Sequence, residues 1–440
     1  MSSETFLYLI LKTKPMPTIK FIKENPDVIK KDLKKRNDLE KLKWIDIILK
    51  KHEQYLDLLK KEQELRHKRN VISEEINQLQ KQGKDIKEKI REAKEIPEKV
   101  HKLTAEVEKL RNEISHYLMR IPNILHDSVP VGKDETENKT VRKFGEIKKF
   151  DFELKAHGEI IEKLNLGDFD NAAKVSGRGF YYLLGDLALM ELALQRFAID
   201  SLTKKGFVLA ETPLMLRKKP YEGVTDLKDF ETMMYKIENE DLYLIATSEH
   251  AIGVRFMNHI FNENELPKKF VGISPCFRKE IGSHGVDEKG LFRVHQFNKV
   301  EQFVFCKPED SWKLHEELIK NSEELFKKLK LPYRITNICT GDIGTVAAKK
   351  YDLEVYMPRE KTYKEVVSCS NCTSYQAERL NIKYSKGQEK EYVHTLNCTA
   401  IATSRALRAI LENYQQKDGT VKVPAVLVPY MDEKKVLGKK

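Results

Sequence analysis

A heptad repeat of apolar residues constrains the fold of this chain more than any other feature. It occupies a lysine- and glutamate-rich stretch from about residue 37 to residue 117, which is poor in glycine and proline except near its middle. The seam positions are Leu58, Leu65, Ile72, Leu79 and Ile86, then Val100, Val107, Ile114 and Ile121, with Leu103, Leu110 and Tyr117 in the second heptad position. Such spacing is typical of a coiled coil.

The repeat weakens between Gly83 and Pro97, where the seam position after Ile86 carries only the small residue Ala93. We therefore predict two helices that fold back as an antiparallel hairpin and turn within that zone. Arms of roughly 40 residues, each residue rising about 1.5 Å, give a hairpin on the order of 60 Å long.

Charge alone does not determine the function of this hairpin. Heptads most often form a dimerisation zipper or a spacer. A single-chain hairpin with basic faces could instead bind nucleic acid, and its basic residues include Lys60, Lys61, Arg66, Lys68, Arg69, Lys84 and Lys87. The formal net charge of +11 favours a polyanionic partner, but long solvated helices are also highly charged.

The length of 440 residues allows two or three domains and a sizeable core. The six cysteines are Cys276, Cys306, Cys339, Cys369, Cys372 and Cys398. Their pattern does not indicate a secreted disulfide framework, so we predict a reducing, cytoplasmic location. The apolar run at residues 5–11 is far shorter than the roughly 20 residues of a membrane span. No small-residue cleavage site follows it, so neither a signal peptide nor a membrane partner is expected.

Beyond the heptads the sequence predicts an α+β fold. Pro122 and Pro130 end the helical region, and the polar stretch 132–143 is expected to be a loop or linker. Strand and helix patterns then follow without regular alternation, which favours α+β over a doubly wound parallel sheet. An apolar face predicts a helix at 184–197, which leads into GFVLAETP at 206–213.

Two apolar segments, 272–275 and 299–305, predict antiparallel strands joined by a long polar loop. The loop carries Gly282, Gly285 and Gly290, and its rims carry Arg278, Glu280, Arg293, Phe297 and Glu301. Guanidinium groups match phosphate oxygens, an aromatic face can stack on adenine, and a loop can close over phosphates. These residues favour a nucleotide triphosphate site. An ordinary hairpin with salt-bridged strand ends is the alternative.

Three other segments also carry chemistry. Thr247 and Glu249 follow a predicted strand at 242–245, where they could either accept from an ammonium group or begin a helix as a capping box. KEVVSCSNC at 364–372 and LNCTAIATSR at 396–405 combine polar and small residues, and the second could be an amphipathic core helix. The spacing of Cys369, Cys372, His394 and Cys398 also resembles that of a zinc site.

FRKE at 277–280, followed by GLFRVHQFNKVEQ at 290–302, resembles motif 2 of class II aminoacyl-tRNA synthetases in the seryl-tRNA synthetase form. GFVLAETP resembles motif 1, LNCTAIATSR resembles motif 3, and the NCT form is similar to archaeal and eukaryotic members. The resemblance covers nearly the whole chain from about Met16. It implies a tRNA-binding domain with a coiled-coil arm over 16–125 and a class II catalytic domain, built on an antiparallel sheet, over 126–440. Residues 1–15 are then an extension or a misassigned start.

The resemblance also implies roles for individual residues. The serine-binding residues are Thr247, Ser248, Glu249, Arg278, Glu301 and Thr399. The ATP-binding residues are Arg278, Lys279, Glu280, Arg293, Val294, Phe297, Glu365, Val366, Val367, Ser368 and Arg405. Among these, Arg278, Glu301 and Arg405 are catalytic. Glu365 and Ser368 match the positions associated with Mg²⁺.

Two positions depart from the family pattern. Val367 stands where serine is frequent, which removes one hydroxyl and puts the polar lining of the site in doubt. Cys398 replaces a glycine that is common in bacterial relatives. Because Cys369 and Cys398 fall within segments that match catalytic strands, and the sequence resembles the common form of the enzyme, no zinc is expected.

The implied activity is ATP-dependent activation of L-serine to seryl-adenylate and transfer to the 3′ end of tRNA(Ser), with tRNA(Sec) left open, in a homodimer. Selective recognition of serine would follow from a carboxylate that accepts from its hydroxyl. There are two alternatives, a protein of another class and a class II synthetase-like enzyme for a different amino acid. An RNA-binding or coiled-coil scaffold with an inert catalytic domain would be expected to have lost Arg278, Glu301 or Arg405, and a related ligase for another amino acid would lack the long arm.

Overall fold

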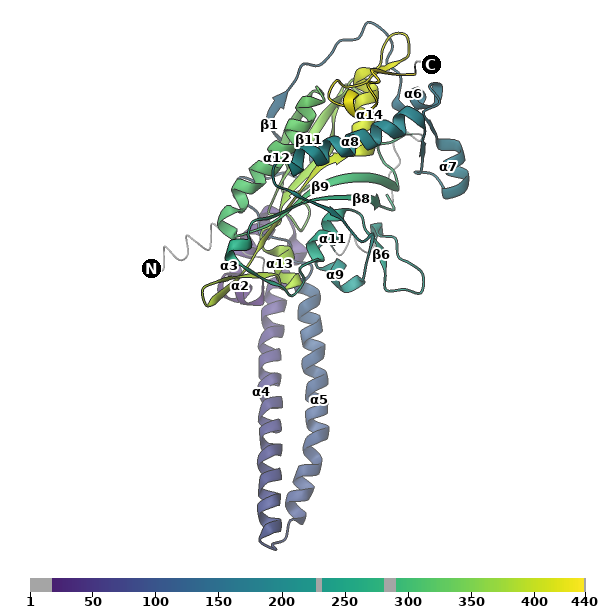
Figure 1. The fold of residues 1–440 in the computed structure, drawn as a ribbon. Coiled ribbons are helices and arrows are strands. Elements are labelled where there is room, and N and C mark those ends of the chain that lie inside the picture. The colour runs from purple at the N-terminus through teal and green to yellow at the C-terminus, as the bar shows by residue number, and fades with distance from the viewer. Residues whose placement is uncertain (1–17, 227–231, 281–289, 439–440) are drawn as a thin grey trace. The chain divides into compact units, whose positions relative to one another are not determined.

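The computed structural model describes residues 18–226, 232–280 and 290–438. The chain divides into two compact units, one formed by Pro17–Pro122 and the other containing Asn123–Lys440. Each unit has its own buried apolar residues, and Figure 1 shows a helical first unit and a mixed second unit. No described helix is long and apolar enough to cross a membrane.

In the described part of the first unit, from residue 18 on, there are four helices: α2 (Ile19–Glu24), α3 (Pro26–Lys35), α4 (Leu39–Lys81) and α5 (Lys87–Leu118). Side chains cap two of them, because Thr18 accepts from the backbone N–H of Phe21 and Asp38 accepts from that of Lys41. The two short helices lie beside the start of α4, with Ile22, Ile29, Leu33, Ile45 and Ile48 buried.

The predicted antiparallel hairpin is confirmed (Figure 1). Ion pairs join the arms along their length: Lys51–Glu113 at 2.5 Å, Lys68–Glu92 at 2.6 Å and Lys89–Glu75 at 2.7 Å. Ile72 and Val100 pack on the seam, together with Ile96, which the heptad assignment did not include.

The turn lies between the end of α4 and the start of α5, at residues 82–86, where Gly83 has φ +66°. That backbone conformation costs glycine little. Pro97 does not end a helix but lies inside α5. Only the glycine end of the weakened zone therefore breaks the helix.

The second unit is built on an eight-stranded sheet. Its strand order is β1 (Lys139–Phe144), β10 (Tyr333–Asn337), β11 (Lys349–Met357), β12 (Thr362–Asn371), β15 (His394–Ala402), β9 (Gln296–Cys306), β8 (Lys268–Phe277) and β4 (Val208–Glu211). Neighbouring strands are antiparallel except β4 and β8, which are parallel. The predicted α+β class with an antiparallel sheet is confirmed.

The prediction of a loop over 132–143 is wrong in its second half, because β1 begins at Lys139 and pairs with β10. Its side chains are mostly exposed, so no apolar alternation revealed the strand. Backbone hydrogen bonding at the edge of a sheet does not require a buried face.

Helices cover both faces of the sheet. The helices α8 (Gly185–Thr203), α12 (Ser311–Lys328) and α14 (Thr403–Tyr414) bury their apolar sides in the larger core cluster. The predicted helix at 184–197 is confirmed and extends to Thr203. Strand β9 alternates between the faces, since Val300 and Val304 join that cluster while Phe303 and Phe305 join a second one on the opposite face.

The helices α11 (Ser248–Val254) and α13 (Tyr375–Leu380) contribute to the second cluster. Other short helices among the described residues are α6 (His157–Lys163), α7 (Phe169–Ser176) and α9 (Lys218–Glu222), with 3₁₀ turns at Glu135–Glu137, Glu263–Glu265, Pro308–Asp310 and Val428–Tyr430. The short strands are β2 (Gly167–Asp168), β3 (Tyr182–Leu183), β5 (Met215–Leu216), β6 (Tyr243–Leu244), β7 (Ile260–Asn262), β13 (Lys383–Lys386), β14 (Glu389–Tyr392), β16 (Val421–Lys422) and β17 (Val436–Leu437).

Candidate active site

A polar cavity of about 400 Å³ lies on the sheet in the second unit, on the face that also carries Phe303. Its walls come from β9, β12 and β15, from the end of β8 and from the first turns of α11 and α14. The cavity brings together most of the predicted site residues: Glu249, Arg278, Phe297, Glu301, Glu365, Val366, Ser368, Thr399 and Arg405.

Two β-bulges shape this lining. In β12, Val367 pairs with Leu353 and Glu365 with Glu354, so Val366 is the extra residue. The bulge places Glu365 and Ser368 on the same face, although regular alternation would separate them. In β15 the extra residue is Ala400, between Thr399 and Ile401. Ala402 consequently lies on the same face as Thr399 and lines the cavity.

One end of the cavity is organised around the buried carboxylate of Glu301. Thr399 donates its hydroxyl hydrogen to Glu301 at 3.0 Å, and the Lys299 ammonium lies 2.8 Å from the same oxygen. Burial raises the pKa of Glu301, and Lys299 and Thr399 oppose that rise. The carboxylate therefore faces the cavity as a hydrogen-bond acceptor that is held from two sides.

A second carboxylate, that of Glu249, lies at the same end. Asn397 donates to it at 3.0 Å and Gln376 at 3.4 Å. Burial, together with the nearby charge of Glu301, raises the pKa of Glu249 to about 7. Two acidic side chains with amide donors and one lysine can recognise a small molecule that carries both an ammonium and a hydroxyl group.

The two interpretations of the segment at 247–249 are compatible. Thr247 is the N-cap of α11 and accepts from the backbone N–H of Glu249 at 3.2 Å, so the capping role is confirmed. Ser248 is buried against Gly272, where an added Cβ would lie 2.5 Å from the serine hydroxyl. Neither Thr247 nor Ser248 lines the cavity, and both directly precede Glu249, which does.

Two arginines, Arg278 and Arg405, also line the cavity. Arg405 lies 3.1 Å from the carboxylate of Glu365 and donates to its backbone carbonyl at 3.2 Å. Burial alone would raise the pKa of Glu365, but Arg405, Lys350 and Arg278 outweigh it and lower the pKa to about 2. The Arg278 guanidinium lies over the ring of Phe297, 5.4 Å from its centroid. A flat ring, two guanidinium groups and an ionised carboxylate suit a nucleotide with its phosphates.

Five other predicted ATP contacts are not among the residues that line the cavity: Lys279, Glu280, Arg293, Val294 and Val367. Lys279 lies over the ring of Tyr235, at 5.8 Å from its centroid. Arg293 is exposed, while Val294 and Val367 are buried. Because Val367 belongs to the core cluster behind the sheet, valine there removes no hydroxyl from the cavity wall. The loop glycines Gly282 and Gly285 lie outside the described residues.

Sequence reasoning missed several residues that line the cavity. Lys299 and Asn397 each stand two positions before a predicted contact on the same strand, so the alternation of strand faces could have identified both. Lys350, Asp226 and the segment 343–347 also line the cavity. No local pattern marks these residues, since tertiary folding alone brings them to the site.

The cysteines of the zinc-like spacing have other neighbours. Cys369 and Cys398 face each other across β12 and β15, His394 Nδ1 lies 2.9 Å from Ser311 Oγ, and Asn397 donates to Cys372. Over residues 18–226, 232–280 and 290–438, no three His, Cys, Asp or Glu side chains form a group that could hold a metal ion.

Comparison with known proteins decides the family. Residues 16–125 match the seryl-tRNA synthetase N-terminal domain, and residues 231–414 match the class II tRNA synthetase core domain (G, H, P, S and T). A serine–tRNA ligase from Methanocella arvoryzae is 60% identical, over 95% of this chain and 99% of that protein. The chain belongs to the seryl-tRNA synthetase family. The resemblance inferred from the motifs is thereby confirmed.

Two solved structures of the same family have the fold of this chain. The crystal structure of seryl-tRNA synthetase from Pyrococcus horikoshii, complexed with ATP, matches with a TM-score of 0.89 and 49% identity, over 96% of this chain and 99% of that one. The cytoplasmic serine–tRNA ligase from Naegleria fowleri, in complex with AMP, matches with a TM-score of 0.81 and 38% identity, over 94% and 95%. Members of the family with nucleotides bound thus share this fold.

Proposed function

We infer that this protein is an ATP-dependent serine–tRNA ligase. The observation that carries this inference is that one cavity is lined by two buried carboxylates, those of Glu249 and Glu301, together with two arginines, Arg278 and Arg405. In the first step a carboxylate oxygen of serine attacks the α-phosphorus of ATP, and the bond to the bridging oxygen breaks to release pyrophosphate. In the second, the 3′-hydroxyl of tRNA(Ser) attacks the carbonyl carbon of seryl-adenylate, and AMP leaves.

Serine fits the acidic end. Glu249 would take the α-ammonium group, with Thr247 and Ser248 holding the turn that presents it. Glu301 would accept from the serine hydroxyl, supported by Thr399. A carboxylate that is left unpaired when alanine binds provides selectivity of roughly 10⁴–10⁵ in sites of this kind.

ATP fits the two arginines and the ring of Phe297. Arg278 would bridge the serine carboxylate and the α-phosphate, Phe297 would stack on adenine, and Arg405 would neutralise the outer phosphates. No side chain is needed as a nucleophile, because positioning and charge neutralisation can carry this chemistry. The residues Lys279, Glu280, Arg293, Val294, Val366 and Val367 remain proposed ATP contacts, the last two through their backbone.

The site also fits Mg²⁺. This ion prefers one or two protein oxygen ligands together with substrate phosphates and water. Glu365 is ionised, and the β12 bulge places the Ser368 hydroxyl on the same face. These two residues would hold the ion, which when bound neutralises phosphate charge.

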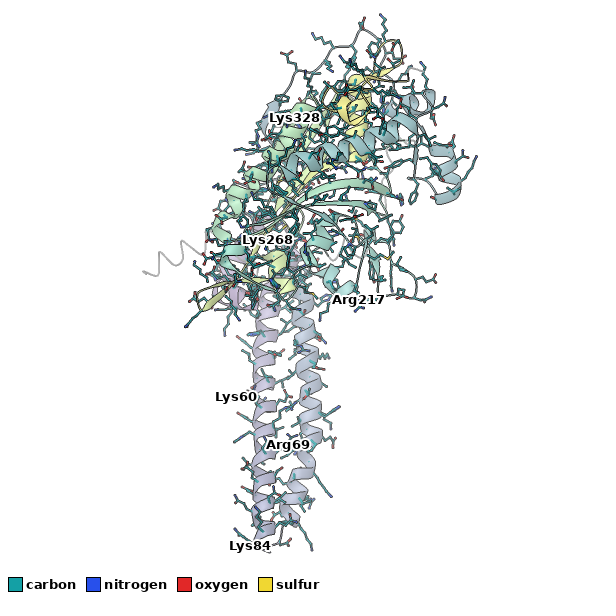
Figure 2. All side chains as sticks on the ribbon, viewed as in Figure 1. Lys60, Arg69, Lys84, Arg217, Lys268 and Lys328 are labelled. Atoms are coloured by element: carbon teal, nitrogen blue, oxygen red, sulfur yellow. The ribbon has the colours of Figure 1, made fainter. Side chains whose placement is uncertain are left out.

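The helical hairpin is proposed to bind tRNA(Ser). Its basic side chains project along the arms, and Figure 2 labels Lys60, Arg69 and Lys84. Each is exposed. Phosphate contacts of this kind give affinity that falls steeply with salt. Accordingly we propose a tRNA-binding domain over 16–125 and a catalytic domain over 126–440, acting in the cytoplasm.

The active form is proposed to be a homodimer. Strand β4 is at the edge of the large sheet, and its Val208 and Leu209 are 58% and 49% exposed. The adjacent helix α8 leaves Leu192 62% exposed. An exposed apolar edge strand beside an apolar helix position favours cover by another chain, and a second copy of this protein would supply it.

ATP–pyrophosphate exchange with a panel of amino acids tests the reaction. Exchange should occur with serine and be lost in Glu301→Ala, but not in Glu309→Ala, which removes an exposed carboxylate outside the cavity. Exchange with a different amino acid would overturn the substrate. Absence of exchange with every amino acid would favour a scaffold role.

A further inference from the structure

A buried charged cluster lies close to the cavity without lining it. His157 begins α6, and Arg408 and Glu412 lie one turn apart on α14. These side chains are 0%, 2% and 0% exposed, and none of them borders the cavity. Arg408 donates to Glu412 at 3.0 Å and also pairs with Glu360. Burying such groups is costly unless they are paired, so their arrangement is specific.

Hydrogen bonding fixes the state of His157. The backbone N–H of Leu291 donates to its Nε2 at 2.9 Å, so that nitrogen carries no proton. The ring proton therefore sits on Nδ1, which lies 3.2 Å from Glu412 Oε1 and donates to it. His157 is a neutral ring that accepts at one nitrogen and donates at the other.

His157 Nε2 binds the backbone of the segment that precedes β9. Leu291 is fully buried, and the ring of the next residue, Phe292, lies beneath two guanidinium groups. Its centroid is 5.2 Å from Arg405 and 4.7 Å from Arg408. A contiguous set of contacts thus runs from His157 through Leu291 and Phe292 to Arg405, which reaches the cavity.

We propose that His157 is a positioning residue for ATP binding, which orients Arg405 through Leu291 and Phe292. This inference rests on the proposed function, since Arg405 is assigned there to the phosphates. His157 contacts no substrate itself. Its contribution should appear in the KM for ATP and leave the KM for serine unchanged, because the acidic end of the cavity shares none of these contacts.

Two substitutions separate the two bonds of the ring. In His157→Asn the side-chain amide nitrogen can replace Nδ1, so the bond to Glu412 is kept and the bond to Leu291 is lost. In His157→Gln the longer side chain can replace Nε2, so the bond to Leu291 is kept and the donor to Glu412 is lost. The two variants therefore lose hydrogen bonds to different neighbours, Leu291 in the first and Glu412 in the second.

Serine-dependent ATP–pyrophosphate exchange and thermal unfolding are then measured on the full chain. We expect His157→Asn to raise the KM for ATP about tenfold, as for one lost hydrogen bond. His157→Gln should stay within about twofold of the wild type while being no more stable than His157→Asn. His394→Asn is the matched control, because His394 is also buried but bonds Ser311 away from the cavity, and its KM for ATP should not change.

Phe292→Leu provides an independent test, since it removes the ring beneath Arg405 but keeps an apolar side chain. It should raise the KM for ATP as His157→Asn does. The proposal is overturned if the KM for ATP is unchanged in His157→Asn or Phe292→Leu. It is also overturned if the increase in the KM for ATP correlates with the decrease in unfolding temperature across all variants, including His394→Asn. A wild-type protein without serine-dependent exchange would instead overturn the proposed function.

Discussion

Glu301 and Thr399 stand directly opposite each other on β9 and β15, and the threonine hydroxyl donates to the carboxylate at 3.0 Å. This cross-strand pair is at the acidic end of the cavity, beside Lys299. A substrate hydroxyl that binds Glu301 therefore meets an acceptor whose orientation is already set. Such pre-organisation reduces the cost of ordering the site during binding.

Thr399→Val should raise the KM for serine. Valine has the shape of threonine but cannot donate, so Glu301 loses one partner that holds its orientation. Loss of a hydrogen bond to a charged group costs about 1.5–3 kcal/mol, which corresponds to roughly a tenfold to hundredfold increase. Steady-state exchange measures it, with the KM for ATP as internal control. An unchanged KM for serine would remove Thr399 from the serine site.

Lys299→Met should cause a larger loss. The lysine is 6% exposed and lowers the pKa of both Glu301 and Glu249. Without it two carboxylates share a buried site, and breaking such a pair costs about 2–5 kcal/mol. We expect exchange at neutral pH to fall at least about 30-fold and to recover partly as pH rises, because the carboxyl pKa values increase. A loss that is equal at every pH would contradict this explanation.

Serine binding should weaken as pH falls below neutrality. In the free protein burial and Glu301 raise the pKa of Glu249 to about 7, so the carboxyl group is increasingly protonated at lower pH. A protonated Glu249 cannot pair with an ammonium group. The KM for serine should rise below pH 7, whereas the KM for ATP should not, because the pKa of Glu365 is only about 2. Profiles from pH 6 to pH 8.5 test this, and a flat serine profile would refute it.

Periodic patterns in the sequence predicted the elements with regular apolar spacing. Heptads predicted the hairpin, and two apolar segments predicted β8 and β9. Strand β1 was missed because its side chains are mostly exposed. The turn lies within the predicted zone but at its glycine end, because packing against the other arm can keep a helix intact through Pro97, even though an isolated helix would lose about 3 kcal/mol there.

The site was predictable in its residues more than in its geometry. Motif resemblance identified Glu301, Glu365 and Thr399, but the bulge that aligns Glu365 with Ser368 adds one residue to a strand and leaves no pattern. The same bulge explains why Val367 points into the core, where a hydroxyl would find no substrate. The buried His157 had no signal at all, because its partners Leu291 and Glu412 are distant in sequence.

Weakening the hairpin seam should separate the two proposed steps. Ile96 is 3% exposed and packs with Ile72 and Val100 between the arms. Ile96→Ala should destabilise the hairpin by about 2–5 kcal/mol, as for other large-to-small core substitutions. If the hairpin positions tRNA(Ser), the KM for tRNA in aminoacylation should rise several-fold while serine-dependent exchange, which needs no tRNA, stays unchanged. Glu106→Ala, at an exposed, non-basic position on the same helix and outside this seam cluster, is the matched control. A loss of exchange in Ile96→Ala would show instead that the catalytic unit depends on the hairpin for its own folding.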